Sequence, residues 1–324
     1  MKARNKGDDA LNNRLLSILT RSVPLKIRKI RNIRHHVFYL ETDACPIILK
    51  GYSSMQRLQL QEAFAASLKA EGFRHSYKFY QFLENPIYFN KKYYGWIEYI
   101  EPHPEPFNYL TTANRKAGIN LLQLFHGTTK KLAKRYERIL PEFNLRDKWN
   151  ERFIQFKKNQ QIVQHYVSKE IINEIDDWGK ISLIGMETEK YKFSDTFDPV
   201  ILHGDVAHHN YLRAKTGKLY LIDYDLISIG DRSADLLQYA NRILPSMNWS
   251  WAMLSQFPVL QPYLQNRAFL FALMYPSDIF REWNRIIKEG TYLMPKKLLP
   301  VVELTTRQFD LRQQFISELK NMVK

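Results

Sequence analysis

The sequence predicts an α+β fold, in which a β-rich N-terminal region is followed by a mainly helical C-terminal region. Residues 25–50 contain short β-branched and aromatic runs separated by turn residues, a pattern typical of strands. Three prolines within 102–106 then interrupt the chain, because proline cannot continue a helix. Beyond them, apolar residues recur mostly at helical spacing. We therefore expect a β-rich domain at 1–100, a linker at 101–106 and a helical domain at 107–324.

Local patterns predict the individual elements. The runs 36–40 and 46–50 are the clearest strand candidates. Ser53 or Ser54 is a suitable helix N-cap, and the apolar residues behind it recur at helical spacing to about Ala70. The same criterion predicts later helices at roughly 114–138, 233–243, 264–275, 278–288 and 300–322.

Cysteine content and apolar segments limit the class of protein. A single cysteine, Cys45, excludes an intramolecular disulfide framework and a cysteine-based zinc cluster. The N-terminus lacks the apolar run of a secretory signal. The most apolar later stretch, 257–275, includes two glutamines and an arginine, so no transmembrane span is expected. We expect a cytoplasmic protein.

The charge of the chain is strongly positive. A formal net charge of +15 favours polyanions, anionic surfaces or phosphate-bearing ligands. The densest basic block, 21–34, contains six lysines and arginines and no acidic residue. Interleaved apolar residues predict a solvated strand face there, and a surface for a phosphate or an assembly partner is the alternative. Without a recognisable nucleic-acid-binding module, DNA or RNA is not the expected partner.

Polar residues with catalytic potential gather in a loop and hairpin that interrupt the helical region. A short strand at 199–202 leads into His203-Gly204-Asp205, Asn210 follows, and Asp223 ends the next predicted hairpin. In-line phosphoryl transfer needs a carboxylate that orients or deprotonates the attacking hydroxyl, and oxygen ligands for Mg²⁺. Asp205 suits the first role, and Asn210 and Asp223 suit the second.

The motif His-Gly-Asp, four residues, Asn at 203–210, followed by Ile-Asp at 222–223, resembles the signature of aminoglycoside phosphotransferases, choline kinases and related kinases. Asp231 and Asp235 extend the resemblance, which covers residues 201–236. It implies a bilobal protein-kinase-like fold and an ATP- and Mg²⁺-dependent phosphotransferase that acts on a hydroxyl of a small molecule. It also implies roles for single residues: Asp205 as the catalytic aspartate, Asn210 and Asp223 as Mg²⁺ ligands, His203 as a brace for the loop, and Asp231 and Asp235 as its ties to the following helix.

By the same resemblance, the N-terminal region supplies the remaining nucleotide contacts. Lys50 is expected to bind the α- and β-phosphates, with Glu62 as its ion-pair partner. Backbone groups from Glu98 to Ile100 are expected to bind adenine. Between Gly7 and Gly51 there is no glycine, so no glycine-rich phosphate loop exists, and the choice between ATP and GTP stays open. At Asp225 many relatives carry glycine or glutamate. Three roles stay open for this residue: a further metal contact, a carboxylate that faces the substrate, or a solvated side chain at the hairpin end.

Other functions remain open. His203, Asp205, His208 and His209 fall within seven residues and include common zinc ligands, as in a metal hydrolase. The segments 121–126 and 149–156 loosely resemble kinase-like spore-coat proteins, which allows a catalytically silent, spore-associated assembly role. Residues 241–324 contain eleven Lys and Arg against six Asp and Glu, so a polycationic acceptor is not expected.

Overall fold

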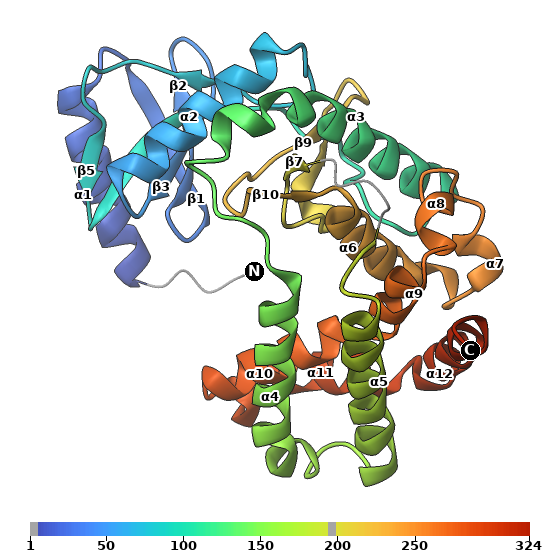
Figure 1. The fold of residues 1–324 in the computed structure, drawn as a ribbon. Helices are drawn as coiled ribbons and strands as arrows, with labels where there is room; N and C mark the ends of the chain where they lie inside the picture. The colour runs from blue at the N-terminus through green and yellow to red at the C-terminus, as the bar shows by residue number, and fades with distance from the viewer. Residues whose placement is uncertain (1–5, 194–198) are drawn as a thin grey trace. The chain divides into compact units, whose positions relative to one another are not determined.

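The structure is a computed structural model that describes residues 6–193 and 199–324 (Figure 1). The chain forms two compact units. The sheet unit comprises residues 1–107 and 210–225, and the helical unit comprises residues 108–209 and 226–324. This spatial division places the 210–225 hairpin with the sheet, whereas the functional boundaries expected from the sequence, at 101–106, stay a prediction.

An antiparallel sheet forms the centre of the sheet unit (Figure 1). The strand order is β1-β2-β3-β6-β4, and β5 also pairs with β6. The strands are β1 (Ile27–Arg34), β2 (Val37–Thr42), β3 (Ile47–Tyr52), β4 (Phe79–Tyr80), β5 (Ile87–Phe89) and β6 (Lys92–Glu98). Two helices, α1 (Lys6–Ser22) and α2 (Met55–Ala70), and the hairpin of β8 (Tyr211–Arg213) and β9 (Leu219–Leu221) complete the unit.

One face of this sheet packs against a hydrophobic core, and the other face carries Lys50. Because side chains alternate along a strand, Leu49 and Lys50 of β3 point to opposite faces. Leu49 belongs to a buried cluster to which α1 contributes Leu15 and Leu19. The opposite face of β3 therefore carries Lys50, and the register pairs Lys50 with Val37 on one side and Gly95 on the other. The core on one face thus holds Lys50 at a defined position on the other.

Helix α2 begins and packs largely as the sequence predicts. The Ser54 hydroxyl accepts a hydrogen bond from the Arg57 amide at 3.2 Å, which is the expected N-cap. The buried face includes Leu58 and Gln61 together with Phe64 and Leu68. Leu58 lies against Gly95 of β6, where an added Cβ would come within 2.6 Å of a Leu58 methyl carbon. The missing side chain at Gly95 therefore allows α2 to approach the sheet.

The β8–β9 hairpin is attached to the sheet unit by backbone and ring contacts. The Leu221 amide donates to the His75 carbonyl at 2.8 Å, and the His103 amide donates to the Arg213 carbonyl at 2.8 Å. The Tyr211 ring stacks on Phe107 with ring centroids 5.0 Å apart. These contacts bring residues 210–225 beside segments that precede them by more than 100 positions.

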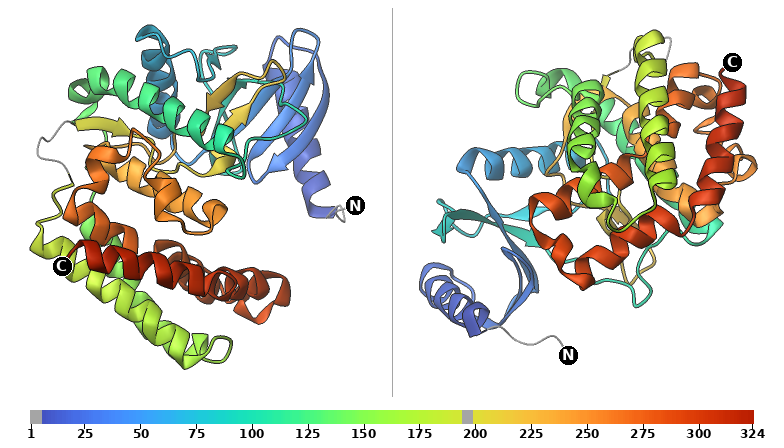
Figure 2. Two further views of the ribbon diagram at one scale, coloured as in Figure 1. Left: turned by 90° about the vertical axis from the view of Figure 1, so that its right-hand side faces the viewer. Right: turned by 90° about the horizontal axis from the view of Figure 1, so that it is seen from below.

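The helical unit is built around a two-stranded sheet and packed helix pairs (Figure 2). Helix α3 packs on β7, α5 packs on α9 and α4, and α10 packs on α4 and α11. The elements are α3 (Thr112–Tyr136), α4 (Leu145–Val163), α5 (Lys169–Thr188), β7 (Pro199–Leu202), η1 (His208–Asn210, which crosses the unit boundary), β10 (Ser228–Asp231), α6 (Ser233–Ile243), η2 (Leu244–Met247), α7 (Trp251–Leu254), α8 (Gln261–Leu264), α9 (Arg267–Met274), α10 (Ser277–Lys288), η3 (Thr291–Leu293), α11 (Pro295–Thr306) and α12 (Phe309–Met322).

One predicted helix is wrong in its extent. The sequence predicts a single helix at about 300–322, but α11 ends at Thr306 and α12 begins at Phe309. Gln308 lies between them, and its side chain accepts a hydrogen bond from the Trp249 indole at 3.0 Å and donates one to the Pro245 carbonyl at 3.1 Å. These tertiary contacts favour a break that local periodicity does not reveal. The predicted order, β-rich and then helical, is confirmed.

Among the residues that the structure describes, no helix combines the length and the apolar character needed to cross a bilayer.

Candidate active site

In the helical unit, the loop after β7 is held by the carboxylate of Asp235, near the start of α6. Its oxygens accept hydrogen bonds from the amides of His203 at 2.7 Å and Gly204 at 3.0 Å. Burial raises the pKa of this carboxyl. The hydrogen bond and charge of His126 and the contacts with His203 lower it by more, so the pKa lies below its ordinary value. Asp235 is therefore ionised and ties the loop to α6, the contact expected from the sequence.

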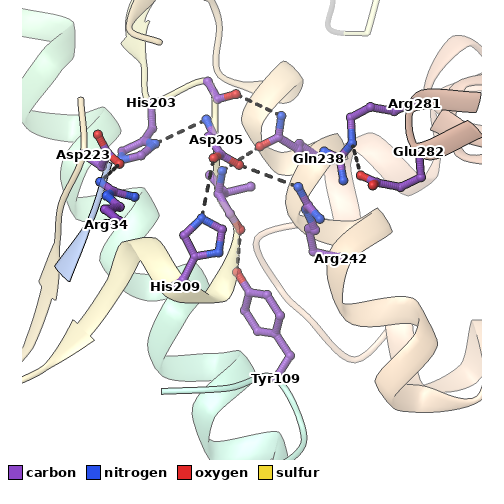
Figure 3. Close-up of polar contacts among 12 residues, drawn as sticks. Arg34, Tyr109, His203, Asp205, His209, Asp223, Gln238, Arg242, Arg281 and Glu282 are labelled. Carbon is purple, nitrogen blue, oxygen red and sulfur yellow. Dashed lines mark hydrogen bonds and ion pairs between the residues drawn. The ribbon is translucent and has the colours of Figure 1, made fainter. Parts of the chain in front are cut away.

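A second pair of side chains holds the next part of the loop. Gln238, one turn after Asp235 on α6, accepts from the Val206 amide at 2.6 Å and donates to the Gly204 carbonyl at 3.2 Å. The Tyr109 hydroxyl donates to the Val206 carbonyl at 2.6 Å (Figure 3). The backbone on both sides of Asp205 is thus bound to side chains of α6 and of the segment before α3.

His203 and Gly204 complete the loop. The Asp205 amide donates to Nδ1 of the fully buried His203 at 3.3 Å, so this histidine carries its proton on Nε2. Gly204 has φ +78°, and an added Cβ would lie 2.3 Å from the Leu226 carbonyl oxygen. Only glycine fits this turn without a backbone shift. All four amides from residue 203 to 206 have an acceptor, which orients the Asp205 side chain.

The Asp205 carboxylate lies between two cationic or titratable groups (Figure 3). The Arg242 guanidinium is 3.6 Å away and His209 Nε2 is 4.0 Å away. The Asp205 side chain is 31% exposed, so a ligand can reach it. A carboxylate with a fixed backbone and an accessible side chain can accept a proton from a bound hydroxyl.

In the sheet unit, Lys50 joins two carboxylates from the end of the β8–β9 hairpin. Its Nζ contacts Asp223 Oδ1 at 2.7 Å and Asp225 Oδ1 at 2.8 Å. Arg34 contacts the second Asp223 oxygen at 2.7 Å (Figure 3). Burial raises the pKa of the Asp223 carboxyl, but the Lys50 ammonium and then the Arg34 guanidinium lower it well below its ordinary value. Asp223 is therefore an anion across the physiological pH range.

Asn210 and Asp223 lie at the same end of the hairpin. Because β8 and β9 pair Tyr211 with Leu221, the residues before and after this pair, Asn210 and Ile222, face one another. The Ile222 amide donates to the Asn210 carbonyl at 2.9 Å, and Asp223 is the next residue. Asp223 has φ +72°, a left-handed conformation that costs a non-glycine residue of order 1 kcal/mol. A buried amide and an ionised carboxylate at adjacent strand ends are a donor set that suits Mg²⁺.

The expected ion pair between Lys50 and Glu62 is not formed in the part of the chain that the structure describes; Lys50 pairs with Asp223 and Asp225. The reason is the orientation of α2. Gln61 occupies the buried face of α2 and donates to the Tyr224 carbonyl at 2.8 Å. Glu62, the next residue, is turned about 100° around the helix and so points in another direction. Burial raises the pKa of the half-buried Glu62. A nucleotide contact by Glu62 stays a prediction.

The segment expected to bind adenine follows β6. The Glu98 amide already donates to the Lys78 carbonyl at 2.9 Å, so it is engaged within the protein. Beyond it, the Tyr99 ring packs edge-on against Tyr39 at 4.9 Å between centroids. Tyr39 shares its sheet face with Lys50, because β2 and β3 pair Tyr39 with Ile48. This pair of aromatic rings therefore lies on the Lys50 face of the sheet, and the roles of Glu98 and Ile100 stay predictions.

Tyr109, Gln238, Arg242 and Gln61 contribute to the site but were not singled out by sequence reasoning. Gln238 and Arg242 follow Asp235 at i+3 and i+7, so all three share one face of α6. That polar spacing is visible in the sequence and could have revealed the side chains of α6 that hold residues 203–206 and contact Asp205. Gln61 could have been preferred to Glu62, because helical spacing places Gln61 beside Phe64 and Leu68 and turns Glu62 away from them. Within residues 6–193 and 199–324, no group of three or more His, Cys, Asp or Glu side chains is placed to hold a metal ion.

No protein-family model matches the sequence, but solved structures resemble this one. An aminoglycoside phosphotransferase from Alicyclobacillus acidocaldarius has a TM-score of 0.70 at 14% identity, covering 95% of this chain and 96% of that one. A spectinomycin phosphotransferase in its AMP-bound complex has a TM-score of 0.62 at 12% identity, covering 93% and 98%. A choline kinase from Streptococcus pneumoniae has a TM-score of 0.51 at 12% identity, covering 97% and 100%. The chain therefore has the bilobal, protein-kinase-like α+β fold that the sequence predicts.

Proposed function

We propose that this protein is a phosphotransferase of the aminoglycoside phosphotransferase type, which moves the γ-phosphoryl group of ATP to a hydroxyl of a small molecule. Phosphotransferases of the same fold have been solved with AMP, with ADP or with GDP, so GTP is an alternative donor. A cytoplasmic location, where both nucleotides are available, belongs to the proposal.

The observation that carries the proposal is the contact between Lys50 and Asp223. The sequence resemblance implies a phosphate-binding role for the first and a metal-binding role for the second, and 173 positions separate them. Their side chains meet at 2.7 Å. A lysine that binds phosphate oxygens and a carboxylate that binds the phosphates' metal ion must lie within a few ångströms of one another. The pair has this arrangement within the sheet unit alone.

The residues at the hairpin end fit a magnesium site. Asn210 and Asp223 would hold the ion, and Lys50 and Arg34 would turn from Asp223 toward the nucleotide phosphates. When bound, Mg²⁺ supplies positive charge that neutralises the phosphate oxygens during transfer. Asp225, which contacts Lys50 at 2.8 Å and is 44% exposed, helps to keep that lysine at the hairpin end.

Asp205 would orient the acceptor hydroxyl and take its proton. Its loop is held at four consecutive amides, and its carboxylate is accessible. We propose that Asp205 acts on the acceptor hydroxyl, whereas Asn210 and Asp223 hold the metal ion of the nucleotide.

A phosphate-transfer screen against a panel of hydroxylated metabolites tests this function. We expect ATP-dependent phosphorylation of at least one compound by the wild type and none by Asp205→Ala. A wild type that binds Mg²⁺ and ATP without transferring phosphate to any compound or to water would instead favour the catalytically silent, kinase-like alternative.

A further inference from the structure

A pocket of about 210 Å³ lies beside Asp205 within the helical unit. Three helices line it: α4 through Lys148 and Arg152, α6 through Arg242, and α10 through Arg281. Lys148 and Arg152 are four positions apart, so they lie on the same face of α4. In Figure 3, Arg242 and Arg281 both lie on the Gln238 side of Asp205. Four cations therefore surround a small pocket next to the proposed catalytic carboxylate.

These cations have few anionic partners. Within the described residues, neither Lys148 nor Arg152 has a carboxylate within 4.0 Å; the Lys148 ammonium lies over the Phe143 ring at 5.4 Å. Arg242 has Asp205 at 3.6 Å, and Arg281 has Glu282 at 3.0 Å. Burial and the neighbouring arginines lower the pKa values of Lys148, Arg152 and Arg242. The cluster is thus a site of repulsion between like charges.

The nearby carboxylates do not remove this excess. Asp278, which also lines the pocket, binds the Arg312 guanidinium through both oxygens at 2.9 and 3.2 Å. Glu282 is shared by Arg281 and Arg285, which contacts it at 2.6 Å. Each carboxylate beside the pocket is therefore already paired with at least one arginine, and neither Lys148 nor Arg152 forms an ion pair within 4.0 Å in the described part of the chain.

We infer that this pocket binds the acid group of an anionic acceptor, a small hydroxylated molecule that carries a phosphate or a carboxylate. The inference rests on the proposed function, because it identifies the class of substrate whose hydroxyl reaches Asp205. Guanidinium groups bind both kinds of oxyanion in a bidentate manner. The volume is below the range of about 300–1,000 Å³ that is usual for drug-sized ligands, so the bound group is small. Such a pocket rejects polycations by repulsion.

Binding of simple probes, measured calorimetrically without nucleotide, tests the inference. Glycerol 3-phosphate and glycerate represent the two acid groups, and glycerol and choline are the neutral and cationic probes. We expect at least one of the two anions to bind and glycerol and choline not to bind. Arg152→Gln and Arg281→Gln should each weaken anion binding roughly ten- to hundredfold, because each removes a charge-assisted hydrogen bond.

The matched control is Arg285→Gln, which lies one turn from Arg281 on α10, shares the same Glu282 and does not line the pocket. Its anion affinity should equal that of the wild type. Arg152→Gln should also melt at or above the wild-type temperature, because it removes a cation from a repulsive cluster; a purely structural arginine would destabilise the protein on removal. Equal loss of anion affinity in all three variants would refute the inference.

ATP separates this inference from the proposed function. If saturating ATP with Mg²⁺ displaces the bound anion competitively, the cations serve nucleotide phosphates and the inference fails while the kinase function stands. If ATP does not bind at all but the anion binds and depends on Arg152, the proposed function fails and the pocket remains an anion site. Binding of both together supports the two proposals jointly.

Discussion

Two aspartates that the same motif brings to attention are held in opposite ways. Asp205 is positioned through its backbone, since the surrounding amides are bound by Asp235, Gln238 and His203. Asp223 is positioned through its side chain, since Lys50 and Arg34 each contact one carboxylate oxygen at 2.7 Å. The backbone of Asp205 is therefore fixed, and its carboxylate lies 3.6 Å from Arg242 and 4.0 Å from His209. The carboxylate of Asp223 makes two close ion pairs, and its backbone is left-handed.

The difference matches the two tasks that phosphoryl transfer requires. A residue that accepts a proton must keep its direction while its carboxylate stays accessible, so its loop must be rigid. A carboxylate that binds a metal ion must stay ionised whether or not the metal is bound. Cationic side chains such as Lys50 and Arg34 are suitable partners for it when the metal ion is absent. Removing the backbone contacts of Asp205 and removing the charged contacts of Asp223 should therefore damage different steps.

The largest effect on catalysis is expected for Asp205→Asn. The amide retains the size of the side chain but cannot accept the hydroxyl proton, so kcat should fall by roughly 10²- to 10⁴-fold. Nucleotide affinity should stay within about threefold of the wild type, because the charged contacts of Asp223 are untouched. Steady-state kinetics and calorimetry measure both quantities, with Asp177→Asn, an exposed aspartate of the helical unit, as control.

The largest effect on stability is expected for Asp235→Asn. The variant replaces one accepting oxygen by a donor that faces backbone amides, and it leaves His126 without a carboxylate, so unfolding should become easier by about 3–5 kcal/mol. Denaturant titration measures this change. A loss below about 1 kcal/mol would show that the hydrogen bonds from Asp235 to the loop after β7 contribute little to stability.

The same variant tests the pH dependence of stability. The pKa of Asp235 is lower in the folded than in the unfolded chain, so its stabilising contribution is complete above the ordinary value of 3.8 and is lost as the pH falls through and below it. Between pH 5 and pH 3, wild-type stability should therefore fall more steeply than that of Asp235→Asn. Parallel curves would show that the carboxylate carries no such linkage.

An intermediate effect is expected for Lys50→Met in the sheet unit. Loss of a charge-assisted contact to the phosphates should weaken nucleotide binding roughly ten- to hundredfold. The helical unit's loop is not involved, so anion binding at Arg152 should not change. Lys29→Met, an exposed lysine of β1, is the control. Equal nucleotide affinity in wild type and Lys50→Met would remove Lys50 from the site.

The smallest effect is expected for Gln238→Met, which has a similar size but leaves the Val206 amide without its acceptor. The expected cost is about 1–3 kcal/mol of stability. As a positioning residue, Gln238 should change kcat more than the KM for nucleotide. The exposed Gln123→Met on α3 is the control, and an unchanged melting temperature and kcat in Gln238→Met would show that the contact with the Val206 amide is dispensable.

Much of this architecture could be predicted from local patterns, and the remainder depends on packing. The strands and the N-cap at Ser54 follow from periodicity and residue type, and the motif at 203–210 follows from its resemblance to the signature of known kinases. The break between α11 and α12, and the hydrogen bond from Gln61 to the Tyr224 carbonyl, depend on partners distant in sequence. The anion pocket was inaccessible to sequence reasoning for the same reason, because its cations come from three helices and span more than 130 positions of the sequence.

The central claim is that Asp223 binds the metal ion of a nucleotide while Asp205 does not hold the nucleotide. Calorimetric titration of ATP, with and without Mg²⁺, into the wild type, Asp223→Asn and Asp205→Asn tests it most directly. We expect Mg²⁺-dependent binding that Asp205→Asn retains and Asp223→Asn loses. Absence of binding to the wild type, or equal binding by all three proteins, would contradict it.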